Sequence, residues 1–470
     1  MNTIQHQACH LSEKEILEKV KSLLSLLPRY KKQPKETLNR LLNQRKIIRN
    51  SLPKTIGIFY PRFFDGGVER VISLQIPIYL ALGYKVVLIT EEIREEHEYP
   101  LHPSVTRAVI PRKLKDGRLQ ELGVVLHSKK IELLIHHGAI SQNLVWDLAL
   151  ANQLEIKTIV CRHEVPAFNF MLGTQPKRLE RIILEPLIYR LADYMVVLGR
   201  MEASYYRSFG INAVFIPNPP TFSPEVNPHK LNTSQIKKIV WIGRLDQATK
   251  NFKAALEIML RIAKSNENIE CYLVGPEADP GSGKFVQNFI LNNKMQKRIF
   301  WTGRVKNISY LLQDSTVHLV TSFTESFSMV ILESKSFGVP LVMFELQHLE
   351  ILKDNKGVIR IPQGHVELAS EAILKILSSP SEEKKLSNEA FQSFKEFYKK
   401  YNIFEMWKKI IIDDKSLKHS SPDSALCDFA IMQNNLLELG LNKSSPSYKW
   451  SEIKNKTTKL LTCKLFGFIK

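Results

Sequence analysis

The chain has 470 residues, of which 44% are hydrophobic and 24% charged, and its formal net charge is +19 at pH 7. A single hydrophobic core stops growing near roughly 250–300 residues, and this composition is far from the polar bias of disordered chains, so we expect a folded protein of two domains with extensions. The basic charge predicts a polyanionic neighbour, such as nucleic acid, anionic lipid or a phosphorylated substrate.

The cysteines and the apolar runs indicate in which cellular compartment the protein is expected. The chain has five scattered cysteines, without CxxC or metal-ligand spacing: Cys9, Cys161, Cys271, Cys427 and Cys463. This pattern indicates neither a disulfide framework nor a zinc site. No window approaches ~20 uninterrupted apolar residues, and the N-terminus lacks the basic-then-apolar order of a secretory signal. We therefore expect a cytoplasmic protein that does not span a membrane.

Much of the positive charge lies at the two ends, in a helical extension over residues 1–53 and in a tail over residues 413–470. Both ends mix Lys and Arg with large apolar residues at helical spacing. One interpretation is a helix that lies on an anionic membrane surface, at the inner face of the cytoplasmic membrane. The other is a solvated helix that packs on its own domain, and the pattern fits both equally.

The first domain is predicted over residues 54–216. A short apolar run from Thr55 is followed by a segment of helical periodicity over residues 66–83 and then by a β-branched run over residues 84–90. This order predicts a βαβ unit. Further apolar runs at residues 131–137, 156–161 and 194–199 alternate with helical segments. Such alternation indicates a parallel sheet that is covered by helices on both faces.

The Pro- and Asn-rich residues 217–235 predict an interdomain linker, and the alternation restarts over residues 236–398. A further helix is expected over residues 399–412. The fold class is therefore α/β, with two doubly wound, Rossmann-like domains that face an interdomain cleft. Ligands of such sheets bind outside the carboxyl ends of the strands, so we expect the chemistry in this cleft.

Two glutamates follow a predicted strand of the second domain. Glu325 lies in a strand-to-helix loop and Glu333 lies eight residues later within the helix. At ~1.5 Å per residue the separation is ~12 Å, too far for the carboxylate pair of a glycosidase at ~5–9.5 Å, but suitable for the two ends of an extended ligand. The helix N-terminus between them favours phosphate. Taken alone, the spacing is better explained by a helix cap and an exposed ion pair.

Two cations follow the first predicted strand of the same domain, in the sequence WIGRLDQATKN. Arg244 and Lys250 are placed on a post-strand loop, where they are suited to neutralise a leaving diphosphate. A solvated loop is the alternative for these two residues alone.

With these motifs in this order, residues 55–412 resemble a family 4 glycosyltransferase, a retaining enzyme of the GT-B fold. The resemblance implies that Arg244 and Lys250 hold the donor diphosphate, that Glu325 contacts the donor sugar and that Glu333 binds ribose hydroxyls. It also implies donor contacts from the residues between the glutamates, which are Ser326, Phe327, Ser328 and Met329. The family commonly has Gly-Phe-Gly where this chain has Ser-Phe-Ser.

The first domain offers further candidates. Gly66 and Gly67 resemble the glycine loop of the family, where the backbone approaches the donor; the alternative is a turn at the start of a helix. His163 matches a family histidine that faces the transferred sugar; the alternative is a structural hydrogen-bonding role. Neighbouring Glu164 is a candidate for the acceptor side.

The resemblance implies a retaining hexosyltransferase that moves a sugar from a UDP- or GDP-sugar to a saccharide or lipid-linked acceptor, in synthesis of bacterial envelope polysaccharide, lipopolysaccharide or glycolipid. Its catalytic residues would be Arg244, Lys250, Glu325 and His163. No DxD follows a strand, so we expect no metal and no cofactor. The alternatives are a nucleotide-sugar epimerase or hydrolase and a non-catalytic GT-B partner subunit.

Two other classes are excluded by the motifs. No recognised nucleic-acid motif accompanies the basic charge, so we expect no nucleic-acid partner. The sequence GPEADPGSGKF resembles a P-loop, but Phe285 stands where Ser or Thr would bind magnesium, which argues against an ATPase.

Overall fold

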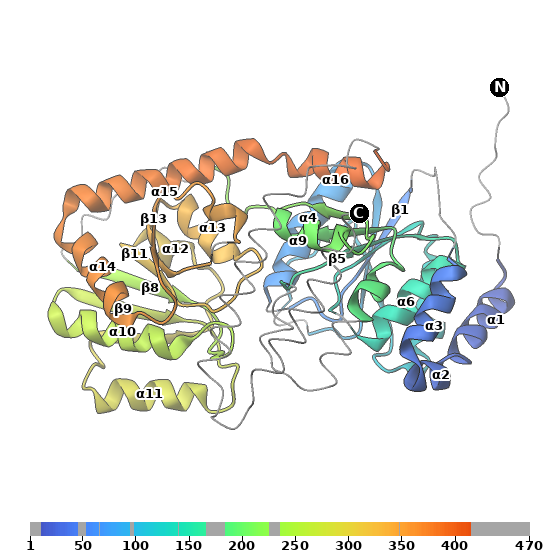
Figure 1. The fold of residues 1–470 in the computed structure, drawn as a ribbon, viewed down its shortest axis with the longest axis horizontal. Coiled ribbons are helices and arrows are strands. Elements are labelled where there is room, and N and C mark those ends of the chain that lie inside the picture. Colours follow the sequence, from blue (N-terminus) through green and yellow to red (C-terminus); the bar gives the residue numbers. More distant parts are fainter. Residues whose placement is uncertain are drawn as a thin grey trace, which may run out of the picture.

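The computed structural model describes residues 11–45, 53–64, 66–94, 98–139, 141–165, 184–224, 236–346 and 348–414. They form two α/β domains side by side, each built on a parallel sheet with helices packed against it (Figure 1). The predicted fold class is thereby confirmed.

The first sheet has the strand order β3-β2-β1-β4-β5-β6-β7, and all its pairings are parallel. Its strands are β1 Thr55–Phe59, β2 Lys85–Thr90, β3 Thr106–Val109, β4 Leu133–His136, β5 Lys157–Cys161, β6 Tyr194–Val197 and β7 Ala213–Phe215. In the centre, Ile56 of β1 pairs with Val86 of β2 and with Leu133 of β4. The central strands β1, β4 and β5 are buried along their whole length because helices cover both faces of the sheet.

The helices of the first domain divide between two core clusters. They are α4 Gly67–Ala81, α5 Arg118–Ser128, α6 Gln142–Gln153 and α9 Arg200–Arg207, with the 3-10 turn η2 Leu114–Asp116. Helices α5, α6 and α9 contribute to one cluster and α4 to the other. Gly66 precedes α4 directly after the β1 loop, so the glycine loop lies at the carboxyl edge of this sheet.

Between residues 11 and 45, three helices precede β1 and pack on the first domain: α1 Glu13–Leu24, α2 Leu27–Lys32 and α3 Pro34–Asn43. A capping box between Ser12 and Glu15 fixes the start of α1. Buried residues Ile16 and Val20 of α1 and Leu41 of α3 share a core with α5 and α6. In this part of the chain the apolar side faces the domain, which favours the packing interpretation over a membrane-bound helix. The tail after residue 414 lies outside the described residues.

The second sheet has the strand order β10-β9-β8-β11-β12-β13, again with parallel pairings. Its strands are β8 Lys237–Ile242, β9 Ile269–Val274, β10 Ile299–Gly303, β11 Val317–Val320, β12 Leu341–Phe344 and β13 Val358–Ile361. Its helices are α10 Phe252–Ser265, α11 Ser282–Asn292, α12 Ser309–Gln313, α13 Met329–Ser336 and α14 Val366–Ser378, with the 3-10 turn η3 Glu350–Leu352.

The chain returns to the first domain through two consecutive helices. Helix α15 Pro380–Lys400 runs along the second domain, and α16 Ile403–Ile411 lies on the first (Figure 1). Trp407 of α16 is buried edge-on against Tyr79 of α4, with ring centroids 5.2 Å apart. Buried Lys157 of β5 donates to the carbonyls of Ile410 and Ile411, which satisfies the C-terminus of α16. The two domains are thus joined both before β8 and after α15.

Among the described residues, none of the helices is both long enough and apolar enough to cross a lipid bilayer.

Candidate functional site

The site lies where the strand order of the second sheet reverses. Strands β8 and β11 are hydrogen-bonded neighbours, although β9 and β10 separate them in the sequence. The chain leaves β8 toward one side of the sheet and β11 toward the other, and ligands of doubly wound sheets bind at this point. Arg244 and Lys250 follow β8, while Glu325 follows β11, so the topology brings together loops that are distant in sequence.

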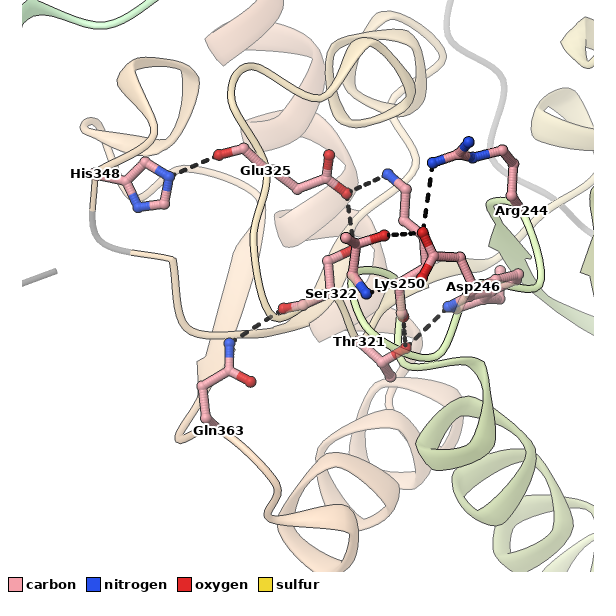
Figure 2. A network of polar contacts seen from close by, with 10 residues as sticks. Arg244, Asp246, Lys250, Thr321, Ser322, Glu325, His348 and Gln363 are labelled. Carbon is pink, nitrogen blue, oxygen red and sulfur yellow. Dashed lines mark hydrogen bonds and ion pairs between the residues drawn. The ribbon is translucent and has the colours of Figure 1, made fainter. Parts of the chain in front are cut away.

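Lys250 and Glu325 are in direct contact. Lys250 Nζ lies 2.5 Å from Glu325 Oε1, and Ser322 Oγ donates to the same oxygen at 2.7 Å (Figure 2). The Glu325 side chain is 10% exposed and that of Lys250 21% exposed. The structure therefore places a cation and a carboxylate together at the edge of the sheet, both accessible to a ligand.

The loop that carries Glu325 is held from several sides. Trp241 of β8 donates to Thr321 Oγ1, which in turn donates to the carbonyl of Lys250. The ring of His348 hydrogen-bonds the carbonyl of Glu325 at 2.7 Å, and Gln363 donates to the carbonyl of Ser322 (Figure 2). These contacts fix the backbone on both sides of the glutamate.

His348 and Gln363 were missed by the sequence analysis. His348 follows β12 and Gln363 follows β13, at the same carboxyl edge as the predicted site residues. Polar side chains directly after the last two strands were the signal that could have found them.

Arg244 is on the same loop as Lys250 but is more exposed. Its side chain is 58% exposed and pairs with Asp246 at 3.4 Å (Figure 2). Burial raises the pKa of Glu69 in the first domain, and the charge of Arg244 acts in the opposite direction, after the larger effect of Arg62. Arg244 is thus the more exposed of the two cations on this loop.

Glu333 is buried between the domains, which excludes an exposed ion pair. It is 1% exposed in α13; its Oε1 accepts a hydrogen bond from Thr221 of the linker at 2.6 Å and forms an ion pair with Arg70 of α4 at 3.0 Å. Burial raises its pKa, whereas Arg70 and Thr221 act in the opposite direction. Glu333 Oε2 is buried and has no hydrogen-bond partner among the described residues. A buried carboxylate oxygen without a donor is expected where a ligand supplies one.

The residues of the Ser-Phe-Ser segment before α13 differ in burial and in backbone conformation. Phe327 is buried in the core of the second domain beside Phe397, so any donor contact from Phe327 is limited to its backbone. Ser326 and Met329 are partly buried. Ser328 precedes α13 in the left-handed conformation, with φ of 63° and ψ of 84°. Glycine adopts this conformation without strain, which accounts physically for the glycine common in the similar family.

Replacing Ser328 by glycine is therefore expected to raise the free energy of unfolding by roughly 0.5–1 kcal/mol, because the left-handed strain is removed. Ser328→Ala keeps that strain and serves as the matched control. Chemical denaturation of the two variants measures the difference. A glycine variant no more stable than the alanine variant would contradict this account.

The glycine loop is structured by a residue that the sequence analysis did not consider. A Cβ on Gly66 would lie 1.9 Å from Glu69 Oε2, while the space around a Cβ on Gly67 is open. Glu69 is buried and pairs with Arg62 at 2.7 Å. A Cβ on Gly66 would thus displace the Glu69 carboxylate, whereas Gly67 is the position with open space.

His163 is held by a second histidine. Its Nε2 lies 2.9 Å from Nδ1 of His137, and the two rings are stacked. Burial and the charge of Arg162 lower the pKa of His163 to about 4, so the ring is neutral at pH 7. Glu164 pairs with Arg162 at 3.4 Å. The structure shows the hydrogen-bonding role of His163, and no contact between described residues joins it to the Lys250–Glu325 pair; its contact with the sugar stays a prediction.

The loop that resembles a P-loop has no open phosphate site at its helix N-terminus. The amides of Gly281 and Gly283 donate to the carboxylate of Glu277 at 2.7 Å and 3.0 Å. This agrees with the exclusion of an ATPase. Within the described parts of the chain, no group of three or more His, Cys, Asp or Glu side chains is arranged to hold a metal ion.

The chain is similar in sequence to known glycosyltransferases. The family model "Glycosyl transferases group 1" matches residues 225–393, which include Arg244, Lys250 and both glutamates. An uncharacterized glycosyltransferase of Haemophilus influenzae is 25% identical over 283 residues, 59% of this chain and 75% of that protein. An α-1,4-N-acetyl-D-galactosaminyltransferase of Campylobacter jejuni is 27% identical over 239 residues, 50% of this chain and 64% of that protein.

Solved structures share the fold at low sequence identity. HepE of Anabaena, in complex with UDP and glucose, has a TM-score of 0.62 at 14% identity, over 77% of this chain and 100% of that one. WaaG, a glycosyltransferase involved in lipopolysaccharide biosynthesis, has a TM-score of 0.59 at 15% identity, over 76% of this chain and 99% of that one. The shared fold and the family model support one conclusion: the chain has the GT-B fold, and its second domain is similar to glycosyltransferases of group 1.

Proposed function

We propose that the chain is a retaining, metal-independent glycosyltransferase that moves a sugar from a UDP- or GDP-sugar to a hydroxyl of a saccharide or lipid-linked acceptor. The observation that carries the proposal is the Lys250–Glu325 contact at the switch point of the second sheet. It provides a cation for a diphosphate and a carboxylate for sugar hydroxyls at one place. The unpartnered Oε2 of Glu333 supports a further polar contact with the same ligand.

In this proposal each group has a distinct task. Arg244 and Lys250 neutralise the diphosphate, Glu325 accepts from hydroxyls of the transferred sugar, and Glu333 accepts from the ribose. Lys250 is already neutralised by Glu325 at 2.5 Å, so the arriving diphosphate must compete for it. Neutral His163 supplies a hydrogen bond to the transferred sugar and no charge.

The reaction needs no protein nucleophile. The bond between the anomeric carbon and the leaving phosphate oxygen breaks through an oxocarbenium-like state, and the acceptor hydroxyl attacks from the same face. A phosphate oxygen of the leaving group takes the hydroxyl proton, so the products are the glycoside and the nucleoside diphosphate. The two cations stabilise the charge that develops on the diphosphate.

The names of the relatives support the biological setting. The Campylobacter jejuni protein acts on an acceptor linked to PP-undecaprenol, and a Bacillus subtilis relative is a poly(glycerol-phosphate) α-glucosyltransferase. Both names describe α-linked products, which correspond to retention when the donor is α-linked. We propose a comparable role in bacterial envelope polysaccharide or glycolipid synthesis. Contact of the basic tail over residues 413–470 with anionic lipid is part of the proposal; liposome flotation of full-length and tail-truncated protein tests it.

The function is tested by thermal shift with a panel of UDP-, GDP- and ADP-sugars, followed by transfer to a candidate acceptor and NMR of the product. We expect one nucleotide class to stabilise the protein and the product to keep the anomeric configuration of the donor. An inverted product would overturn retention. Free sugar or an epimer formed without acceptor would favour a hydrolase or epimerase instead, and no affinity for any donor would favour a non-catalytic subunit.

Metal independence gives a separate prediction. Transfer is expected to continue at an unchanged rate in excess EDTA, because Arg244 and Lys250 supply the positive charge that a metal would provide. Initial rates with EDTA, and after adding manganese, measure this. Complete loss of turnover in EDTA with recovery in manganese would contradict it.

A further inference from the structure

One ion pair joins the two domains beside the donor site. Arg70 lies in the first turn of α4, directly after the glycine loop, and its Nη2 is 3.0 Å from Glu333 Oε1 of α13. The Arg70 side chain is 26% exposed, whereas Glu333 is buried. The proposed ribose ligand of the second domain therefore receives its counter-charge from the first domain.

The two oxygens of Glu333 have different surroundings. Oε1 accepts a hydrogen bond from Thr221 and pairs with Arg70, while Oε2 has no hydrogen-bond partner among the described residues. With Oε1 held from two directions, the carboxylate cannot rotate freely, and Oε2 is the oxygen left for a ligand. A ribose diol offers two O–H donors, which a carboxylate accepts fully only when it is ionised.

Ionisation of Glu333 depends on Arg70. Burial raises the pKa of Glu333, and Arg70 is the largest influence that lowers it, followed by Thr221. Tyr99 also faces this group: its hydroxyl donates to Gly66 O at 3.2 Å, and burial raises its pKa, so it stays protonated near neutral pH. The negative charges of Glu69 and Glu333 also raise the pKa of Tyr99.

On the side of α13 that faces the sheet, His318 of β11 bonds Ser334 at 2.6 Å, and its pKa is lowered to about 3, so it is neutral. Lys335 of α13 is directed elsewhere, to Ile351 O and Ser393. Among these titratable groups, Arg70 is the cation in direct contact with Glu333.

We propose that Arg70 is a positioning residue supplied by the first domain: its contact with Glu333 prepares that carboxylate for the ribose hydroxyls of the donor, so nucleotide binding depends on closure of the two domains. The inference rests on the proposed function, which assigns ribose to Glu333. When the domains separate, Glu333 loses its cation and becomes easier to protonate. A protonated carboxyl then offers a donor where the ribose needs an acceptor.

The loss of Arg70 changes how nucleotide affinity depends on pH, because it changes the pKa of Glu333. In the wild type, affinity for the nucleotide decreases as the pH falls through the pKa of Glu333. In Arg70→Gln that pKa is higher, so the decrease begins at a higher pH. At low pH the variant therefore binds the nucleotide more weakly than the wild type does. The difference in affinity between the two proteins becomes smaller as the pH rises.

The experiment is calorimetric binding of UDP and GDP to the full chain, from about pH 5.5 to about pH 8.5, a range over which a raised carboxyl pKa can be followed. The variants are Arg70→Gln, Arg70→Lys and Glu333→Gln, together with the double variant Arg70→Gln/Glu333→Gln. The control is Arg107→Gln, which removes a partly buried ion pair with Glu98 inside the first domain. Circular dichroism checks the fold of each, and Arg70→Lys keeps the test valid if Arg70→Gln does not fold.

We expect Arg70→Gln to lose about tenfold or more in nucleotide affinity at the acid end, with Arg70→Lys intermediate and Arg107→Gln unchanged. In the Glu333→Gln background, Arg70→Gln is expected to have no further effect. Equal affinity and equal pH dependence in wild type and both Arg70 variants would overturn this inference while leaving the proposed function standing. Absence of UDP and GDP binding in the wild type would instead overturn the proposed function.

Discussion

Replacing Lys250 by alanine is expected to lower kcat/KM for glycosyl transfer by roughly 10²–10³-fold, the usual effect of removing one preorganised stabiliser of developing charge. Lys250 is the cation in contact with Glu325 at 2.5 Å, and its side chain remains accessible. Without it, the negative charge on the leaving diphosphate meets a carboxylate that has lost its counter-charge. Steady-state kinetics with the donor identified by thermal shift measure the loss.

The matched control is Lys253→Ala. Lys253 lies three residues later in the first turn of α10, is exposed, and has its Nζ 4.8 Å from the ring centroid of Phe285. We expect transfer by this variant to equal that of the wild type. Equal rates for Lys250→Ala and Lys253→Ala would contradict the assignment of Lys250, provided both variants unfold cooperatively.

Replacing Arg244 by alanine is expected to lower kcat/KM by at least ~10²-fold with almost no change in stability. The side chain is 58% exposed and its ion pair with Asp246 is 3.4 Å long, so its loss should change the free energy of unfolding by less than ~0.5 kcal/mol. Arg244→Lys is expected to recover only part of the activity, because lysine lacks the planar fork that binds phosphate with two hydrogen bonds. Kinetics and chemical denaturation of each variant measure the two effects.

Arg261→Ala is the control for Arg244. Arg261 is 52% exposed on α10 and pairs with Glu367 at 2.5 Å, so it matches Arg244 in exposure and in having an acidic partner. Transfer by this variant should be unchanged. Full activity in purified Arg244→Ala would remove Arg244 from the donor site.

The parts of the site that belong to one domain were predictable from the sequence. The apolar runs identified the strands, and the turns after β8 and β11 carried Arg244, Lys250 and Glu325. Parallel topology then places these residues at one edge of the sheet. Their contact depends only on strand order, which alternating apolar and helical segments indicate without knowledge of the other domain.

The parts that depend on packing between elements were not predictable. Arg70 is one of two charged residues in α4, and only the arrangement of the two domains brings it to Glu333. Phe327 stands within the predicted donor segment, but local chain direction turns its ring into the core. Likewise, α1 and α3 have an apolar side that suits either lipid or protein, and only the presence of α5 and α6 shows what covers it.

The contacts of Gly66 and His163 were likewise not predicted from the sequence. The sequence indicated close approach of a ligand at Gly66, whereas the structure shows the Glu69 carboxylate over that position. For His163 the sequence left both a structural role and a contact with the sugar open, and the structure adds the hydrogen bond to His137. His137 lies 26 residues before His163, so spacing alone gave no signal of their contact.

The most direct test of the central claim is a crystal structure of the full chain with the nucleoside diphosphate that the thermal-shift panel selects. The account predicts the diphosphate against Lys250 and Arg244, and the ribose hydroxyls against Oε2 of Glu333. A nucleotide bound away from the carboxyl ends of β8 and β11, for example on the loop between β9 and α11, would contradict it.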